Sequence, residues 1–335
     1  MKKILVLAMA AAVVSLMGAC KKEGVYNPKQ KIAKVYSESS STDSYFDGTE
    51  WHTNSHTQSK EIVEEWTWDG KLLTQIAYPY TSEDANGNVT TKYEYTKFTY
   101  DGKQLTEVSS DWERMAITYD GKKLDKIELY YSSYDYDKAS SEPNAIFTFT
   151  YDGKKISKMT ANIEDEEIAN GKNGRPQMGR MTRMLLQSLT PDARGTEKML
   201  AATCEKARKA GAKGRGNVDM LLTWDGNNIS KIEAKYMGMT VQTIEYTYDD
   251  KNNPYQGFLF TLVGDLPFED NQLGFGNENN ITSSKMYEPG DEHPYTENYT
   301  YTYDGKWPVS CSTKHENSDD YNRYSYTSTV YYEYK

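Results

Sequence analysis

Apolar and polar residues alternate ahead of a five-letter motif that recurs along the chain. Thr-Tyr-Asp-Gly-Lys stands at residues 99–103, 118–122, 150–154 and 302–306, with looser copies at 67–71, 223–227 and 247–251. Large side chains such as Phe98 and Tyr100 occupy the positions three and one before the aspartate. A period of two predicts β-strands with one buried face, and Asp-Gly predicts the tight turn of a β-hairpin.

If Asp-Gly forms a two-residue loop, the residue three before the aspartate lies opposite the residue four after it. Phe98 would then pair with Leu105. Val108, seven after the aspartate, would fall on the other face of a regular strand, so either a bulge returns it to the core or both faces are covered. Structural turns are predicted at Asp69-Gly70, Asp101-Gly102, Asp120-Gly121, Asp152-Gly153, Asp225-Gly226 and Asp304-Gly305.

The composition supports a sheet protein. The chain has 29 tyrosines and 6 tryptophans, and aromatic residues favour strands. The motif spacing is too irregular for a strict solenoid. We therefore predict an all-β fold, a long twisted antiparallel meander of Asp-Gly hairpins that is either extended or curled into a roll or open barrel.

One segment breaks the strand pattern. Residues 170–217 carry eleven Lys and Arg against three acidic residues, and tyrosine disappears there. Met181, Met184, Leu185 and Leu189 share one helical face, which predicts an inserted helical hairpin. The insertion either caps the sheet, with its basic side chains meeting acidic strands, or docks onto anionic lipid or another polyanion.

The N-terminus has the pattern of an export signal. Lys2 and Lys3 precede an apolar run, and small residues lead to Cys20. This resembles a bacterial lipoprotein signal, which implies that Cys20 is lipidated and attaches the protein to the outer membrane. The predicted organisation is a signal at 1–19, a lipidated tether at 20–35 and a repetitive β-sheet domain at 36–335. The sequence leaves open whether the protein faces the periplasm or the cell surface.

Charge and cysteine content narrow the partners. The net charge is -10, which argues against nucleic acid. Besides Cys20, the chain has Cys204 and Cys311, which either pair in the oxidising envelope or are small buried residues.

Candidate chemistry is sparse. His52 and His56 form the only close histidine pair, but their segment reads as strand or loop, so we expect no metal site there and no cofactor. No nucleophile elbow or phosphate-binding loop is present. A polysaccharide hydrolase needs only an Asp/Glu pair, which 49 acidic residues neither exclude nor locate.

Aromatic residues outside the predicted core form a candidate binding surface. Rings on a sheet face either stack on sugars or form ordinary cross-strand ladders. The candidate ligand-binding residues are Tyr93, Tyr95, Tyr131, Tyr134, Tyr324 and Tyr326.

The stretch Tyr248-Asp249-Asp250-Lys251-Asn252-Asn253-Pro254-Tyr255, followed by Asn279-Asn280-Ile281-Thr282, carries a family resemblance. It resembles an uncharacterised β-sheet domain common in lipoproteins of gut Bacteroidetes. The repeated motif is also similar, more distantly, to the tyrosine-aspartate repeats of Rhs-type shells. The resemblance runs from about residue 36 to the C-terminus and implies a sheet-rich fold and an envelope location, with no catalytic residues to transfer.

These observations favour a lipid-anchored, non-enzymatic envelope protein. Its aromatic sheet would bind or scaffold a glycan or an envelope protein, and its lipid would contact the membrane. The alternatives are an envelope polysaccharide hydrolase and a carrier of hydrophobic molecules.

Overall fold

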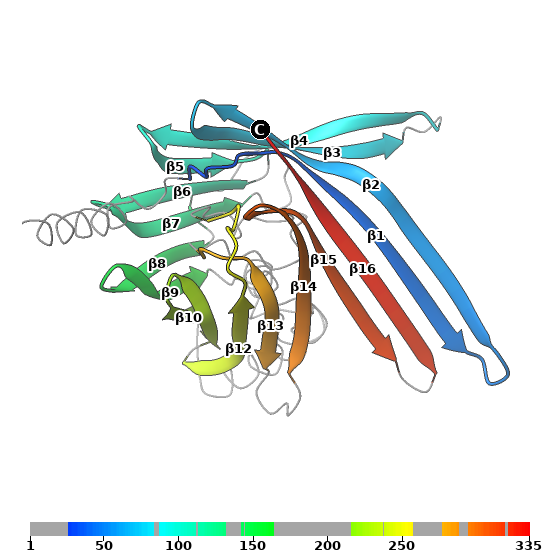
Figure 1. Cartoon of the computed structure of the whole chain (residues 1–335). Helices are drawn as coiled ribbons and strands as arrows, with labels where there is room; N and C mark the ends of the chain where they lie inside the picture. The colour runs from blue at the N-terminus through cyan, green and yellow to red at the C-terminus, as the bar shows by residue number, and fades with distance from the viewer. Residues whose placement is uncertain are drawn as a thin grey trace, which may run out of the picture.

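The computed structural model is an all-β antiparallel barrel of sixteen strands (Figure 1). It describes residues 26–83, 87–111, 113–131, 142–143, 145–163, 216–236, 238–256, 277–287, 294–318 and 321–335. Each strand pairs with the next in the chain, and β1 pairs with β16 to close the barrel. The strands are β1 (Ile32–Phe46), β2 (Trp51–Asp69), β3 (Leu72–Glu83), β4 (Val89–Asp101), β5 (Gln104–Ser109), β6 (Glu113–Asp120), β7 (Lys123–Tyr131), β8 (Ala145–Asp152), β9 (Lys155–Ile163), β10 (Gly216–Asp225), β11 (Asn228–Tyr236), β12 (Met239–Tyr248), β13 (Ile281–Tyr287), β14 (Tyr295–Asp304), β15 (Trp307–Ser318) and β16 (Asn322–Tyr334).

The predicted all-β antiparallel class is confirmed, but the sheet closes fully rather than forming an open barrel. The helical insertion predicted at 170–217 lies almost entirely outside the described residues, and its last two residues, Gly216 and Asn217, begin β10. Cys204 also lies outside them, so its pairing with the buried Cys311 stays a prediction. In the described part of the chain, no helix has the length and apolarity that a membrane crossing requires.

The repeated motif sets a register different from the predicted one. Asp101 pairs with Gln104, so the loop residues are Gly102 and Lys103 rather than Asp-Gly. A register shift before Tyr100 then places it opposite Leu105, and Phe98 lies opposite Val108. The same shift recurs at the other motifs. Each hairpin therefore contains a bulge, which brings the residues four and seven after the aspartate to the same core face.

At six of the seven motifs, the aromatic residue before the aspartate donates a hydrogen bond to a backbone carbonyl oxygen of a neighbouring segment, and Tyr334 at the end of β16 does the same. Tyr100, for example, donates its hydroxyl hydrogen bond to the carbonyl oxygen of Leu73, 2.8 Å away on the preceding hairpin. Such bonds satisfy backbone groups beside the bulges. We call these contacts the aromatic clasps. They span 2.5 to 2.9 Å and join Trp68 to Ile32, Tyr100 to Leu73, Tyr119 to Leu105, Tyr151 to Leu124, Trp224 to Ile156, Tyr248 to Ile229 and Tyr334 to Pro308.

The two ends of the barrel differ. Because the strands alternate in direction, every glycine turn of the motif lies at one end, which we call the turn end, together with the start of β1 and the end of β16. The opposite end, the loop end, carries the connections from β1 to β2 and from β15 to β16. Gly102 has φ of 61° at its turn, a conformation that glycine adopts without the steric cost that a Cβ brings.

Buried aromatic side chains close the turn end. Tyr26 and Tyr255 are 5% and 2% exposed, and each ring packs against Trp66 with centroids 6.3 and 6.2 Å apart. The hydroxyl of Tyr26 donates to the carbonyl oxygen of Pro254 at 2.7 Å. The Asp-Asp-Lys-Asn-Asn-Pro-Tyr stretch that carried the family resemblance thus places Tyr255 in the core.

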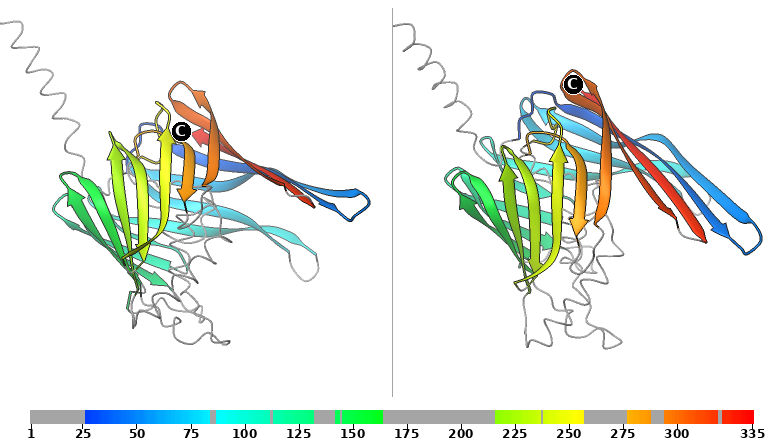
Figure 2. Two further views of the ribbon diagram at one scale, coloured as in Figure 1. Left: turned by 90° about the horizontal axis from the view of Figure 1, so that it is seen from below. Right: turned by 60° about the horizontal axis from the view of Figure 1, so that its bottom comes forward.

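At the loop end the β3–β4 hairpin extends past its neighbours, and so does a separate group of four strands (Figure 1). β2 pairs with β3 only from Glu65 to Asp69, and β14 pairs with β15 only from Tyr299 onwards. Past these points β15, β16, β1 and β2 continue together as a four-stranded ribbon, whose strands project away from the others in Figures 1 and 2. Most residues on both faces of this ribbon are polar, with aromatic rings such as Trp51 and Tyr324 among them, in contrast to the apolar inner wall elsewhere.

Candidate binding surface

The inner face of the ribbon carries a set of polar and aromatic side chains. Alternation from the buried Val35 and Tyr332, which pair with each other, identifies the inward positions along β1 and β16. The cross-strand register then continues this face onto β2 and β15. We call the resulting set the inner panel, and it consists of Ser39, Ser41, Asp43, Asn54, His56, Gln58, His315, Tyr324 and Tyr326.

Three rings lie in a row on β14, β15 and β16. His315 is stacked between Tyr295 and Tyr326, with centroid distances of 6.0 and 6.3 Å and interplanar angles of 17° and 28°. The side chain of His315 is 25% exposed. The planes of neighbouring rings in this row are therefore close to parallel.

A buried carboxylate holds the central ring of this row. Glu297 is fully buried on the inner face of β14, and its Oε1 lies 2.8 Å from Nε2 of His315. The other carboxylate oxygen accepts a hydrogen bond from the hydroxyl of Tyr299 at 2.5 Å, and the Tyr295 hydroxyl lies 2.6 Å from Nδ1 of His315. The contacts with Glu297 and Tyr295 lie at the two different nitrogens of the His315 ring. The chain of contacts fixes the orientation of the His315 ring.

The outer face of the ribbon is different. Its hydroxyl groups bond to one another across strands, as in the pairs Ser44 with Thr53 at 2.9 Å and Thr42 with Ser55 at 3.3 Å. Such pairs stabilise a sheet, and they occupy hydroxyl groups that would otherwise be available to hydrogen-bond a ligand. The inner face is therefore the better candidate for binding.

The predicted tyrosines are divided between the two faces. Tyr324 and Tyr326 lie on the inner panel, and Tyr324 is 40% exposed. Tyr93 and Tyr95 stack on each other at 6.2 Å, but on the outer face of β4, where they alternate with the buried Phe98 side. Tyr131 ends β7 with its side chain outside the described set, and Tyr134 lies outside the described residues. The four tyrosines whose side chains the structure describes therefore lie on two different faces.

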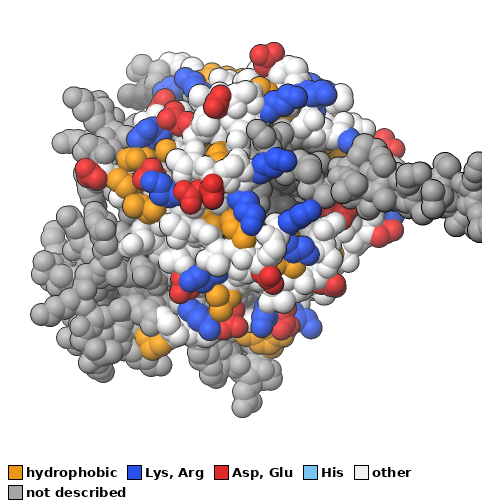
Figure 3. All heavy atoms as spheres, turned by 90° about the vertical axis from the view of Figure 1, so that its left-hand side faces the viewer, with side chains coloured by type: hydrophobic (Ala, Val, Ile, Leu, Met, Phe, Trp, Pro, Cys, Tyr) orange, Lys and Arg blue, Asp and Glu red, His pale blue; other side chains and the backbone are white. Residues whose placement is uncertain are grey.

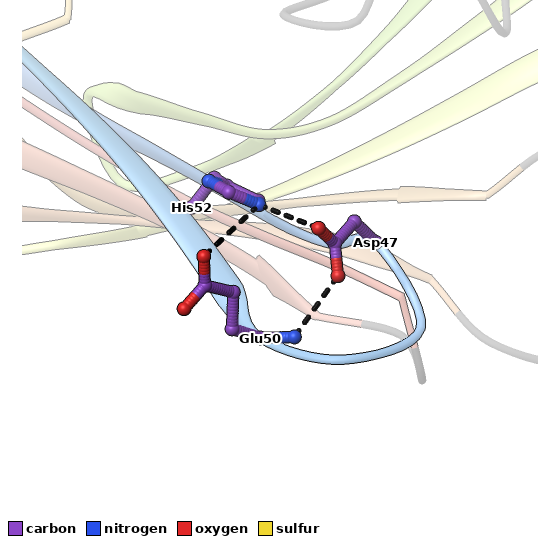
Figure 4. A group of neighbouring side chains, drawn as sticks. All are labelled: Asp47, Glu50 and His52. Atoms are coloured by element: carbon purple, nitrogen blue, oxygen red, sulfur yellow. Dashed lines mark hydrogen bonds and ion pairs between the residues drawn. The ribbon is translucent and has the colours of Figure 1, made fainter.

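Three side chains at the tip of the β1–β2 hairpin could hold a metal ion (Figure 4). Asp47, Glu50 and His52 place their ligand atoms within 4.8 Å of one another. The Oδ1 atom of Asp47 already accepts hydrogen bonds from Thr49 Oγ1 at 2.6 Å, Thr49 N at 2.8 Å and Glu50 N at 2.9 Å. These bonds, with that from the Thr49 side chain first, hold the pKa of Asp47 well below its ordinary value. We interpret the group as a cap of the hairpin tip.

The sequence singled out His52 with His56 instead. On an extended strand, residues four apart are about 13 Å apart, too far to share one ion. His52 contacts Oδ2 of Asp47 at 2.8 Å and stacks on Tyr45 at 4.9 Å. His56 lies farther along the same face, opposite Ser41 on the inner panel.

A second buried carboxylate lies in the aromatic core near the turn end. Glu64 has no exposed surface, and its Oε2 accepts a 2.6 Å hydrogen bond from the indole of Trp66. Burial raises the pKa of Glu64 from 4.5 to about 8, and the Trp66 bond only partly opposes this. Burial likewise raises the pKa values of Tyr26 and Tyr78, near Glu64, so these groups stay neutral. The Glu64 carboxyl is therefore protonated at neutral pH.

Comparison with known proteins gives distant fold neighbours. No family model and no curated protein matches the chain. A porin-like protein from Bacteroides uniformis matches with a TM-score of 0.47 and 13% identity, covering 91% of this chain and 98% of its own. A porin-like protein from Bacteroides vulgatus matches with a TM-score of 0.29 and 10% identity, covering 92% and 99%. A protein of unknown function from Bacteroides fragilis matches with a TM-score of 0.17 and 7% identity, covering 61% and 81%. Similarity at this level transfers no function, so any function has to be argued from this chain's own residues.

Proposed function

We propose that this chain is a lipid-anchored, non-enzymatic protein of the cell envelope that binds a glycan on its inner panel. The observation that carries the proposal is the row of three rings, Tyr295, His315 and Tyr326, set among hydroxyl, amide and imidazole groups. Sugars present apolar ring faces edged by hydroxyl groups. Flat amphipathic rings beside convergent hydrogen-bonding groups match that chemistry.

The charged side chains on the outside of the barrel support the proposal that water, and not lipid, surrounds it. On β11, Lys231, Glu233 and Lys235 alternate with buried residues and form ion pairs of 3.8 and 3.0 Å. Similar outward pairs occur on β7 and between β9 and β10. A lysine facing lipid at the middle of a membrane costs about 2 to 4 kcal/mol. On the face in Figure 3, basic and acidic side chains lie interspersed, with hydrophobic side chains in separate patches.

The position of the tether orients the binding surface. Tyr26 is buried at the turn end, only six residues after Cys20. Six extended residues span about 20 Å, so a lipid on Cys20 would hold the turn end close to the membrane. The ribbon and its inner panel lie at the opposite end and would point away from the lipid surface.

The proposal is tested by measuring binding to a panel of soluble polysaccharides by affinity electrophoresis and calorimetry. Tyr326→Ala removes one ring of the row and should weaken binding at least about tenfold, as for a central aromatic anchor. Tyr93→Ala is the matched control, because it removes an exposed tyrosine from the outer face. No reducing ends should appear during incubation, since binding without turnover is expected.

Three outcomes would contradict the glycan proposal. One is the absence of binding across the panel, another is equal loss in the two tyrosine variants, and the third is release of shorter glycans. The anchor is tested separately by labelling cells with radioactive palmitate. Cys20→Ala should lose the label and leave the membrane fraction, and retention of both would refute lipidation at this cysteine.

A further inference from the structure

The long strand β2 has a free edge at the loop end. From Trp51 to Glu64 it pairs with β1 on one side, whereas its pairing with β3 begins only at Glu65. Among the described residues, no strand pairs with the other side of this stretch. At a strand repeat of about 3.3 Å, the free edge is about 45 Å long. Figure 1 shows β2 forming the border of the ribbon, with the β3–β4 hairpin turning away from it.

Free edges are usually protected against pairing with other chains. Short strands, prolines, bulges and lysines that project along the edge are the common devices. β3, on the other side of the gap, carries Pro79, which lacks an N–H donor. β2 has no proline. Its one lysine, Lys60, lies over the rings of Tyr36 and Tyr331 at 5.0 and 3.7 Å, above the outer face rather than along the edge.

We infer that the free edge of β2 is a docking site for an extended polypeptide segment of another protein, which adds to the sheet as a strand. Only a peptide backbone offers donors and acceptors at the repeat that this edge presents. The guest strand would take the place beside β2 that β3 occupies up to Ala77 and then leaves. The site thus continues an existing sheet instead of creating a new interface.

The side chains of β2 indicate what kind of segment fits. Asn54, His56 and Gln58 point to the inner side of the edge, while Thr53 and Thr57 point to the outer side. A guest strand would place its own side chains beside these polar groups on both faces. The structure therefore favours a polar segment, rich in hydroxyl and amide side chains, over an apolar one.

A second copy of this chain is a poorer occupant. Two β2 edges pairing antiparallel around a twofold axis would point their turn ends in opposite directions. Two copies anchored through Cys20 in one membrane, as the proposed function requires, have their turn ends on the same side. The antiparallel edge-to-edge dimer is therefore disfavoured, and only this step rests on the proposed function.

The test uses the full mature chain and a synthetic peptide with the sequence of Tyr36–Phe46, because this part of β1 already pairs with β2. Binding is measured by fluorescence polarisation, and amide exchange is followed by NMR. Alternate amides of β2 should exchange rapidly in the free protein and become protected when the peptide binds. The control is the same peptide with its internal amides N-methylated, which should bind at least tenfold more weakly because it cannot form the ladder.

Proline substitutions at adjacent positions provide the protein-side control. The N–H groups of Thr57 and Gln58 point to opposite sides of the strand. One of Thr57→Pro and Gln58→Pro should therefore keep the wild-type melting temperature while losing peptide binding at least tenfold, and the other should disturb pairing with β1. The melting curves identify which variant keeps the β1 ladder.

The inference is overturned if all amides of β2 are already protected in the free protein, which would mean that the chain itself or a second copy occupies the edge. Equal binding of the methylated peptide would overturn it too, as would protection that maps to β15. None of these results depends on glycan binding or on lipidation, so the two proposals can fail separately.

Discussion

Replacing the buried Glu64 by glutamine should stabilise the barrel at neutral and alkaline pH. The carboxyl group lies in the aromatic core without exposed surface, and its Oε2 accepts a hydrogen bond from the Trp66 indole. The aromatic groups around it, Tyr26, Tyr78, Tyr255 and Tyr332, all have pKa values raised well above 10.0 by burial and supply no positive charge. Glutamine keeps the size and the acceptor for Trp66 but never ionises.

The pKa values set the size and sign of the effect. The folded state holds the Glu64 proton up to about pH 8, whereas the unfolded chain releases it near 4.5. Stability from the protonated group is complete below pH 4.5 and is lost as the pH rises through about 8. The loss amounts to about 3 kcal/mol at pH 7 and about 5 kcal/mol at full ionisation. Glu64→Gln should remove this dependence.

Urea unfolding of the wild type and the variant at pH 5, 7 and 9 measures the difference directly. The variant should gain about 4 kcal/mol relative to wild type between pH 5 and pH 9, and the other titrating groups cancel in the comparison. Glu65→Gln is the matched control, since Glu65 faces outward on the same strand and pairs with Lys34 at 3.0 Å. An exposed pair contributes only about 0 to 1 kcal/mol, so this variant should change little.

A pH-independent difference between Glu64→Gln and wild type would refute the reasoning. So would a variant that is less stable than wild type at pH 9. Either result would mean that the Glu64 carboxyl ionises freely in the folded barrel and that the core around Trp66 admits water.

Two further substitutions test the repeated hairpin. Tyr100→Phe deletes one aromatic clasp and leaves the Leu73 carbonyl oxygen without this hydrogen bond, so it should lower the free energy of unfolding by about 1 kcal/mol. Tyr93→Phe, on the exposed outer face, is the control and should leave the free energy of unfolding nearly unchanged in chemical denaturation. Equal effects would show that the clasp contributes no stability. Gly102→Ala forces a Cβ into a turn with φ of 61° and should cost about 1 to 2 kcal/mol, whereas Lys103→Ala in the same loop should be near neutral. A neutral Gly102→Ala would mean that the turn rearranges.

The strands and their buried faces follow from the sequence, but the register of the hairpins does not. Period-two alternation before each aspartate correctly places Phe98 and Tyr100 on the inner face. The shift between Thr99 and Tyr100 is invisible to that pattern, because an ordinary two-residue turn also pairs apolar residues. The position of the apolar Val108 indicated the bulge, because a regular strand would have turned its side chain away from the core.

Closure of the barrel could not be predicted from hydrophobic patterning. The seam joins β1 to β16, and along the ribbon it pairs Ser39 with Ser328 and Ser41 with Tyr326. Hydrophobic patterning specifies register only where one face is buried, and this stretch is polar on both faces. The pairing instead brings together segments from opposite ends of the chain, which no local pattern reports.

The sequence analysis did not identify the two buried carboxyl groups, Glu297 and Glu64, although both stand at core-facing positions of the strand pattern. Glu297 interrupts an alternating run of Tyr295, Tyr299, Tyr301 and Tyr303, so it occupies a core-facing position. Glu64 stands in the same way two residues before Trp66. A charged residue in register with buried aromatics predicts a paired or protonated carboxyl group. The residue that pairs with such a carboxyl group, as His315 does with Glu297, depends on which strands become neighbours. The sequence pattern does not specify these neighbours.

The aromatic clasps lie at one end of the barrel, and each joins a hairpin to a neighbouring strand near the glycine turns. Residues added at the other end leave these bonds and the turns unchanged. Strand lengths in fact range from Gln104–Ser109 in β5 to Trp51–Asp69 in β2 within one closed wall. The strands can therefore lengthen at the loop end, and with them new recognition surfaces can arise, while the hydrogen bonds and turns at the turn end stay the same.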